Sequence, residues 1–186
     1  MNAKGNIIVI TRTNMIAGFG DERWNSFMAK LAQRDNYFSK MIMSVTLVPL
    51  EKVMILFDEM GKEFFNNDKA VFAMYGKMGA KSLLSPGGPH QAYMLTKDIN
   101  HFVKFVLPKI WSIFFDSGVF TTKFENNIVH IKITGIDIKN FDFENLVIGY
   151  NQQALKIFGR KSVAKRVRSI SAGGDDFYFQ LELKDA

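Results

Sequence analysis

The chain has 186 residues, of which 47% are hydrophobic and 23% charged, values that suit one folded domain and exclude a disordered or collagen-like chain. It contains no cysteine, which excludes a disulfide framework, cysteine-bound zinc, iron–sulfur clusters and thiol catalysis. Its 18 Phe and 10 Met residues predict a large and adaptable core, because methionine is flexible and fills irregular gaps.

The N-terminal part of the chain predicts one short strand and then helices. Residues Lys4–Thr11 are predicted to form a short buried strand, followed by a glycine-rich turn at 17–20. A helix is predicted over Asp21–Arg34, because its apolar side chains recur every three or four residues. Residues 38–48 are predicted to be extended or irregular, and Pro49 is predicted to be the first residue of the next helix.

Two further helices are predicted on either side of a loop. The first covers Lys69–Leu84, and the segment Ser85–Pro89 after it is the strongest loop signal in the chain. The second, Thr96–Phe115, is the most amphipathic helix of the sequence. Pro108 is expected to kink it, because proline lacks a backbone donor and crowds the preceding turn.

The hydrophobic period changes from helical to alternating in the C-terminal third. Two hairpins are predicted, Val119–Glu125 with Ile128–Ile136, and Val163–Ala172 with Phe177–Lys184. A helix between them is capped at Asp142 or a neighbour and ended by a glycine. This order predicts two pairs of antiparallel strands separated by one helix.

We therefore predict an α+β fold, with a helical N-terminal part packed on a four-stranded antiparallel sheet of strand–strand–helix–strand–strand order. One domain is predicted over residues 1–186, with a mainly helical subdomain at 1–117 and an α+β subdomain at 118–186. The apolar run Ile7–Ile10 is too short for a signal peptide, and Ile99–Phe115 is too short and too charged for a membrane span. We expect a cytoplasmic protein without a membrane partner.

Positive charge is concentrated in residues 152–170. The formal net charge is +6, and this segment contains six cations and no acid. Such a segment is typical of a solvated edge strand that lysine and arginine protect from pairing. It could instead bind an acidic partner, an anionic ligand or nucleic acid, although Phe158 is its only aromatic residue and nucleic acid is not the partner we expect. The candidate anion-binding residues are Arg160, Lys161, Lys165, Arg166 and Arg168.

No motif in the chain predicts catalysis or metal binding. The segment Gly18–Arg23 imitates a dinucleotide fingerprint but lacks its third glycine, and Gly79–Ser82 lies in a predicted helix instead of a phosphate-binding loop. The histidines His90, His101 and His130 do not have the spacing of helical metal ligands. Since nothing supplies a positioned nucleophile or general base, we expect neither an enzyme nor a metal site.

Three segments resemble the haem-NO-binding (H-NOX) family: Lys4–Ile8, Phe19–Trp24 and the Val-x-x-Phe-Asp-Glu-Met-Gly helix at Val53–Gly61. The order of the predicted elements is also similar over nearly the whole chain. The C-terminal half, which ends with residues 173–179, resembles the vinyl-reductase-type small-ligand domain and related bacterial domains. The resemblance implies a sensory fold that holds a small ligand between its helices and its sheet.

The chain departs from the H-NOX family at the positions that the resemblance assigns to haem. In that family a histidine on the long helix binds the iron, and the matching place falls near Ile110. A Tyr-x-Ser-x-Arg motif binds the propionates, and its nearest equivalent here is Ile136-x-Ile138-x-Asn140. Because these residues lack the ligand and the donors, we expect no haem, with His101 as a displaced candidate ligand. The paired cysteines common in vinyl-reductase-type domains are also missing.

We therefore predict a non-enzymatic sensory or regulatory domain that binds a small apolar molecule or a signalling protein. Two alternatives are a haem-based gas sensor with a non-standard ligand, and a binder of nucleic acid or an anionic messenger through residues 156–168. A homodimer that packs helical surfaces is a further option. The predicted ligand-binding residues, which could equally be core, are Phe57, Tyr75, Phe102, Val106, Ile110, Trp111 and Phe114.

Overall fold

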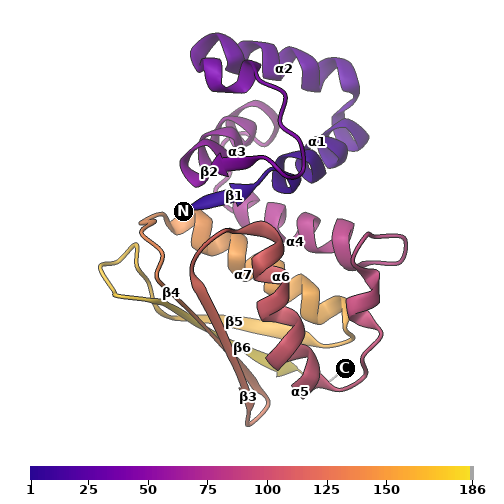
Figure 1. Cartoon of the computed structure of the whole chain (residues 1–186), viewed down its shortest axis with the longest axis vertical. Helices are drawn as coiled ribbons and strands as arrows, with labels where there is room; N and C mark the ends of the chain where they lie inside the picture. The colour runs from indigo at the N-terminus through magenta and orange to yellow at the C-terminus, as the bar shows by residue number, and fades with distance from the viewer. Residues whose placement is uncertain (185–186) are drawn as a thin grey trace. The chain divides into compact units, whose positions relative to one another are not determined.

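The computed structural model describes residues 1–184, which form two compact units (Figure 1). The N-terminal unit comprises residues 2–71, and the C-terminal unit begins at Phe72 and also includes Met1. The predicted α+β class is confirmed, whereas the predicted division at residue 117 stays a prediction. In the described part of the chain, no helix combines the length and the apolar character that a membrane crossing requires.

The N-terminal unit combines a two-stranded sheet with three helices. The strands pair antiparallel, and the buried side chains Ala3 and Val48 lie opposite each other. Gly20 separates the first two helices, and its φ of +88° is a conformation that only glycine adopts without strain. The elements are β1 (Asn2–Lys4), α1 (Asn6–Phe19), α2 (Asp21–Arg34), the short 3₁₀ helix η1 (Asn36–Ser39), β2 (Leu47–Pro49) and α3 (Leu50–Phe64).

The predicted strand over Lys4–Thr11 is wrong, because β1 ends at Lys4 and the chain then enters α1. The four apolar residues of that segment fit a strand and a buried helix equally well. Gly5 marks the change, since its N–H donates to the carbonyl of Thr46 at 2.7 Å and a Cβ there would lie 2.1 Å from the carbonyl oxygen of Met43. The predicted turn at 17–20 is also shorter than expected, because α1 continues to Phe19.

The C-terminal unit contains a four-stranded antiparallel sheet covered by helices. Its strand order is β3-β4-β6-β5, so the last strand of the second predicted hairpin, β6, pairs with β4 of the first hairpin. The elements, of which α4 begins one residue before the unit does, are α4 (Val71–Leu84), the 3₁₀ helix η2 (Gln91–Met94), α5 (Ile99–His101), the π-helix η3 (Phe102–Val106), α6 (Leu107–Phe114), β3 (Val119–Glu125), β4 (Ile128–Thr134), α7 (Phe141–Ile157), β5 (Lys161–Arg168) and β6 (Phe177–Lys184).

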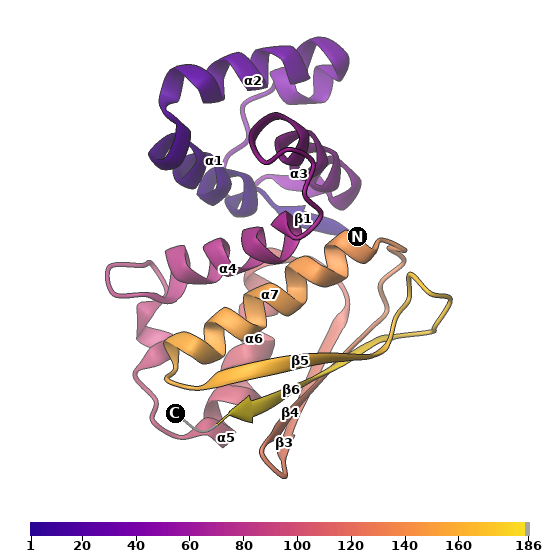
Figure 2. The same ribbon diagram turned by 180° about the vertical axis from the view of Figure 1, so that it is seen from behind.

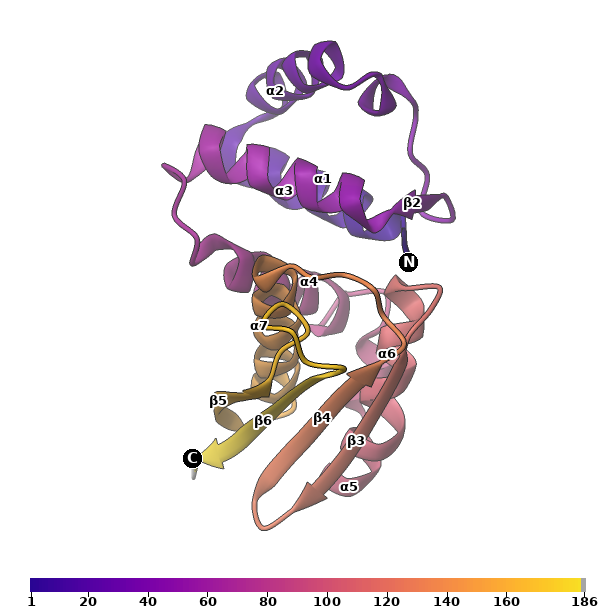
Figure 3. The ribbon, with the colours of Figure 1, turned by 90° about the vertical axis from the view of Figure 1, so that its left-hand side faces the viewer.

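One face of this sheet forms the core of the C-terminal unit. In the two central strands, Ile131 of β4 lies opposite Phe179 of β6, and both side chains are fully buried. The segment η3–α6 packs on β3, while α7 packs on β5 and β6, and both lie on the same face (Figures 2 and 3). The other face carries the alternating polar side chains that the sequence predicted for a half-buried strand.

The long helix predicted over Thr96–Phe115 is divided into α5, η3 and α6. Pro108 is the second residue of α6, and the π-helical turn lies directly before it. Proline cannot donate to the carbonyl four residues earlier, and its ring crowds that turn. A wider π-helical turn relieves this crowding, so the irregularity predicted at Pro108 lies at residues 102–106.

Helices α4 and α7 lie against each other through two glycines. A Cβ at Gly76 would lie 2.0 Å from the carbonyl oxygen of Leu146, and one at Gly149 would lie 2.1 Å from that of Ala73. Backbone atoms cannot move aside as flexible side chains can, so both positions require glycine. This close approach brings Tyr150 of α7 to α4, where a Cβ at Gly79 would meet the Tyr150 ring at 3.7 Å.

Candidate functional site

Six of the seven predicted ligand-binding residues lie in the C-terminal unit. Tyr75 lies on α4, Phe102 and Val106 on η3, and the other three on α6. All six are at most 8% exposed. The seventh, Phe57, is buried in α3 of the N-terminal unit.

The aromatic members of this set contact rings from the sheet and from α7. The ring centroid of Trp111 lies 5.4 Å from that of Phe120 and 6.4 Å from that of Phe143. Phe102 stacks on Phe158 at 4.6 Å. The indole N–H of Trp111 donates to the carbonyl of Ser117 at 3.1 Å, which satisfies its polar atom. These contacts place the predicted residues in the core, and their role as a ligand pocket stays a prediction.

Tyr150 is the residue of this region that the sequence analysis missed as a candidate. Its ring packs edge-on against Phe114 at 5.2 Å, and the residue is only 8% exposed. Its buried hydroxyl has no hydrogen-bond partner among the described residues. Burial raises the pKa of the Tyr150 phenol far above its ordinary value, so the hydroxyl stays protonated. The site therefore contains the neutral phenol of Tyr150 in addition to the buried phenol of Tyr75, and a phenol can both donate and accept a hydrogen bond.

The positions that the family resemblance assigns to haem do not fit that group. Ile110 is 4% exposed and aliphatic, so it offers no axial ligand. Asn140, at the end of the Ile-x-Ile-x-Asn segment, accepts a hydrogen bond from the N–H of Phe143 at 3.0 Å and so caps α7. His101 is exposed, with its ring 5.1 Å from that of Phe105. Within residues 1–184, no three His, Cys, Asp or Glu side chains gather in a way that could hold a metal ion.

The predicted anion-binding residues separate into two groups. Strand β5 is an edge strand, as the charge pattern predicted. Arg166 forms an ion pair with the buried Glu144 at 3.0 Å, and Arg168 binds both carboxylate oxygens of Asp176, at 2.7 and 3.1 Å. Arg160, Lys161 and Lys165 form no ion pair with any described residue, so they are the cations available to an anion.

Asp176 is the centre of a charged cluster beside the exposed face of the sheet. It is 6% exposed, and Lys132 adds a second ion pair at 3.1 Å. Mainly through the hydrogen bonds from Arg168, and also through Lys132, these cations hold the pKa of Asp176 below its usual range. The sequence assigned the aspartate to a turn, because nothing local indicates that two distant cations reach it.

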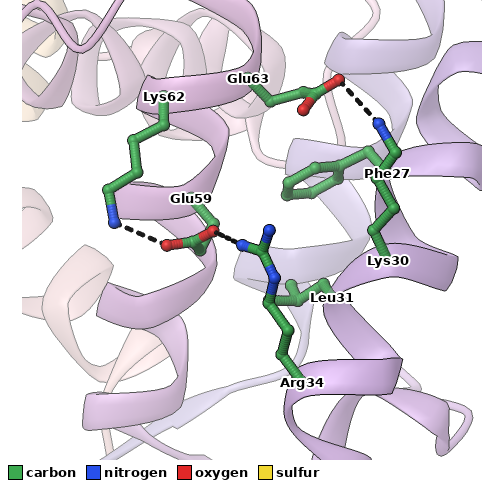
Figure 4. Close-up of a pocket in the computed structure, with 7 residues that line it drawn as sticks. All are labelled: Phe27, Lys30, Leu31, Arg34, Glu59, Lys62 and Glu63. Atoms are coloured by element: carbon green, nitrogen blue, oxygen red, sulfur yellow. Dashed lines mark hydrogen bonds and ion pairs between the residues drawn. The ribbon is translucent and has the colours of Figure 1, made fainter.

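A cavity of about 220 Å³ lies between α2 and α3 of the N-terminal unit (Figure 4). Phe27 and Leu31 form its apolar floor. Its charged rim is closed by mutual ion pairs, among them Arg34–Glu59 at 2.7 Å and Lys30–Glu63 at 3.5 Å. None of the predicted ligand-binding residues lines this cavity. The rim carries three cations and two carboxylates, and since Lys62 also pairs with Asp58, all of these charges are engaged in ion pairs.

Solved structures of H-NOX proteins match the chain over its length. A crystal structure of an H-NOX protein from S. oneidensis in the Fe(II)NO ligation state has a TM-score of 0.73, with 14% identity over 98% of this chain and 99% of that one. The chain has an H-NOX-like fold. An NMR structure of a mutant H-NOX domain from Shewanella oneidensis in the Fe(II)CO ligation state has a TM-score of 0.75, with 15% identity over 98% of this chain and 99% of that one.

A third match is a mutant H-NOX protein from K. algicida in the unliganded Fe(II) form, at a TM-score of 0.65 and 12% identity, over 98% of this chain and 97% of that one. At sequence identities of 12–15%, these matches show a similarity of fold alone. No family model matches the sequence, and no curated protein matches it. The predicted resemblance to H-NOX is thus confirmed in the fold.

Proposed function

We propose that the chain is a non-enzymatic sensory or regulatory domain that binds a small, mainly apolar molecule in its C-terminal unit. The observation that carries the proposal is the buried hydroxyl of Tyr150, which has no hydrogen-bond partner among the described residues. Such a hydroxyl costs about 1–3 kcal/mol when nothing pairs with it. Most buried polar side-chain atoms of folded proteins are hydrogen-bonded, so this hydroxyl is an exception for which a ligand would supply the partner.

The surroundings of Tyr150 define the class of ligand. Phe114 packs on its ring, and the predicted ligand-binding residue Tyr75 is also buried on α4. A ligand at this place would meet aromatic surface and the phenol of Tyr150. We therefore expect a small molecule with one hydroxyl or carbonyl group and an otherwise apolar body.

The H-NOX-like fold supports a sensing role, because the solved H-NOX structures include Fe(II)NO and Fe(II)CO ligation states. We do not propose haem for this chain. The resemblance puts an iron ligand at Ile110 and a propionate partner at Asn140. Ile110 has no atom that can bind iron, and the uncharged Asn140 side chain caps α7. We expect the domain to act in the cytoplasm through a protein partner, with no reaction of its own.

A thermal-shift series tests the proposal with cyclohexanol and cyclohexane as matched probes. We expect cyclohexanol to raise the melting temperature more than cyclohexane, because only the alcohol can pair with the phenol of Tyr150. The variant Tyr150→Phe should remove this difference, and Tyr178→Phe, which alters a hydroxyl on the exposed face of the sheet, should retain it. Equal shifts for both probes in the unmodified protein would contradict the proposal.

Haemin titration tests the alternative function, a haem-based sensor. We expect added haemin to give no sharp Soret band and no one-to-one end point. A stoichiometric haem complex would overturn the proposed function. The variant His101→Ala would then show whether the displaced histidine is the iron ligand.

A further inference from the structure

Strand β5 leaves one edge of the sheet open. Within residues 1–184 it pairs only with β6, and it lies at the end of the strand order (Figure 2). An edge strand presents unpaired backbone N–H and C=O groups on its outer side. Among the described residues, the one further hydrogen bond to its backbone comes from the Gln152 side chain, which reaches the carbonyl of Ser162 at 3.4 Å. The backbone of β5 can therefore accept another strand.

The side chains of β5 divide strictly between the two faces of the sheet. Arg166 lies opposite the fully buried Phe179 and faces α7, where it pairs with Glu144. Every second residue lies on the exposed face, namely Lys161, Val163 and Lys165, and Val163 is 53% exposed. The register shifts between Arg166 and Arg168, so the regular part of the open edge is residues 161–166.

The charge of this edge selects between partners. Lys161 and Lys165 have no ion pair among the described residues, and residues 152–170 contain no acid. Antiparallel pairing of two copies through β5 would place cations beside cations, which costs energy at close range. The same lysines attract a strand that carries carboxylates. The edge thus disfavours a second copy of this chain and favours an acidic segment.

We infer that the open edge of β5 binds an acidic, extended segment of a protein partner by adding a fifth strand to the sheet. Residues two apart share a face of a strand, so the lysines flank Val163 on the exposed face. The matching partner pattern is acid-x-apolar-x-acid, with carboxylates opposite Lys161 and Lys165 and an apolar side chain opposite Val163. This inference rests on the proposed regulatory role, because it names the class of partner through which the domain would act.

Single-stranded nucleic acid fits the same surface less well. Such ligands require aromatic rings on which bases stack, and β5 contains no aromatic residue. Tyr178 of β6 carries a ring on the exposed face, and the guanidinium of Arg168 lies over it, 4.8 Å from its centroid. The surface therefore offers charge and backbone hydrogen bonds without a stacking platform.

Fluorescence anisotropy on the full chain tests the inference with a labelled peptide of sequence Ser-Glu-Thr-Val-Thr-Glu-Ser. The variant Lys161→Glu/Lys165→Glu should weaken binding by about tenfold or more, because two cross-strand attractions become repulsions. The matched control is Lys77→Glu/Lys81→Glu on α4, which makes the same change in net charge at two exposed lysines and should retain the affinity. Equal losses in both variants would overturn the inference.

A second peptide keeps the test independent of any effect of mutation on folding. The same sequence with N-methyl groups on alternate residues has identical charge but cannot form the ladder of hydrogen bonds. On the unmodified protein it should bind about tenfold more weakly or not at all. Equal binding of both peptides would show attraction by charge alone, and displacement of the peptide by an equal concentration of oligo-dT would indicate a nucleic-acid surface. Either outcome overturns the inference.

Light scattering completes the comparison. If the unmodified protein is a dimer and the variant Lys161→Glu/Lys165→Glu is a monomer, the β5 edge binds a second copy of the chain. That result would also contradict an acidic partner. These assays report on the β5 edge only, whereas the cyclohexanol and haemin experiments report on the ligand. A failure of one proposal is therefore distinguishable from a failure of the other.

Discussion

Replacement of Glu144 by alanine is expected to destabilise the C-terminal unit strongly. Its side chain is 2% exposed, and one carboxylate oxygen accepts bonds from the hydroxyl of Ser169 at 2.8 Å and from the N–H and hydroxyl of Ser171 at 3.1 and 3.0 Å. The other oxygen lies 3.0 Å from Arg166 in an ion pair, without hydrogen-bond geometry. Glu144 thus connects α7 to β5 and to the loop that follows β5.

The magnitude follows from these contacts. Each hydrogen bond contributes about 1 kcal/mol net, so the three together contribute about 3 kcal/mol. The ion pair adds about 0–1 kcal/mol, because the Arg166 side chain is 28% exposed and can be hydrated after the substitution. In a chain of this size a loss of about 3–4 kcal/mol corresponds to a melting temperature lower by roughly 6–16 °C.

The measurement is urea and thermal unfolding followed by the fluorescence of Trp111, in a Trp24→Phe background that leaves this reporter of the C-terminal unit. The control is Glu182→Ala, whose exposed ion pair with Lys184 should contribute less than about 1 kcal/mol. If both variants lower the melting temperature equally, the assignment of Glu144 as a buried connecting residue is refuted.

Three further predictions concern stability. Asp176→Asn should destabilise the protein near neutral pH, because the folded-state pKa of Asp176 lies below its unfolded value of about 3.9. The difference in stability from the unmodified protein should disappear as the pH falls through the folded-state pKa, and unfolding measured at a series of pH values checks this. Gly149→Ala should cost about 1–3 kcal/mol or more, because the new Cβ would lie 2.1 Å from the carbonyl oxygen of Ala73, and a variant as stable as the original would contradict the close approach. Asn140→Ala should cost about 1 kcal/mol through the lost cap of α7, whereas Asn140→Asp should retain most of the stability.

The segments with a strong local pattern were predictable from the sequence. Helix α2 covers the predicted residues, and β3 matches its predicted bounds. The prediction that Pro49 begins the next helix differs from the structure by one residue, because Pro49 is the N-cap of α3. In the candidate site, the period of three and four residues correctly indicated that Ile110, Trp111 and Phe114 share a buried face. These predictions succeeded because periodicity and terminal signals act within a few residues.

Other features depended on groups that are distant in the chain. The apolar start of α1 was predicted as a strand, because a short apolar run suits either structure and contacts around Gly5 decide between them. The hydroxyl of Tyr150 could not be recognised as unpaired, since that depends on every element packed around it. The cavity between α2 and α3 likewise exists only where two helices meet.

By itself, the sequence determined the α+β class, the order of most elements and the positive charge of the β5 segment, since composition and periodicity are properties of neighbouring residues. Only the tertiary structure decided what those charges do. Arg166 and Arg168 are neutralised by acids from other segments, while Lys161 and Lys165 are left on the open edge of the sheet. The physical reason is that an ion pair depends on distance in space, and strand order brings together residues that the chain itself keeps apart.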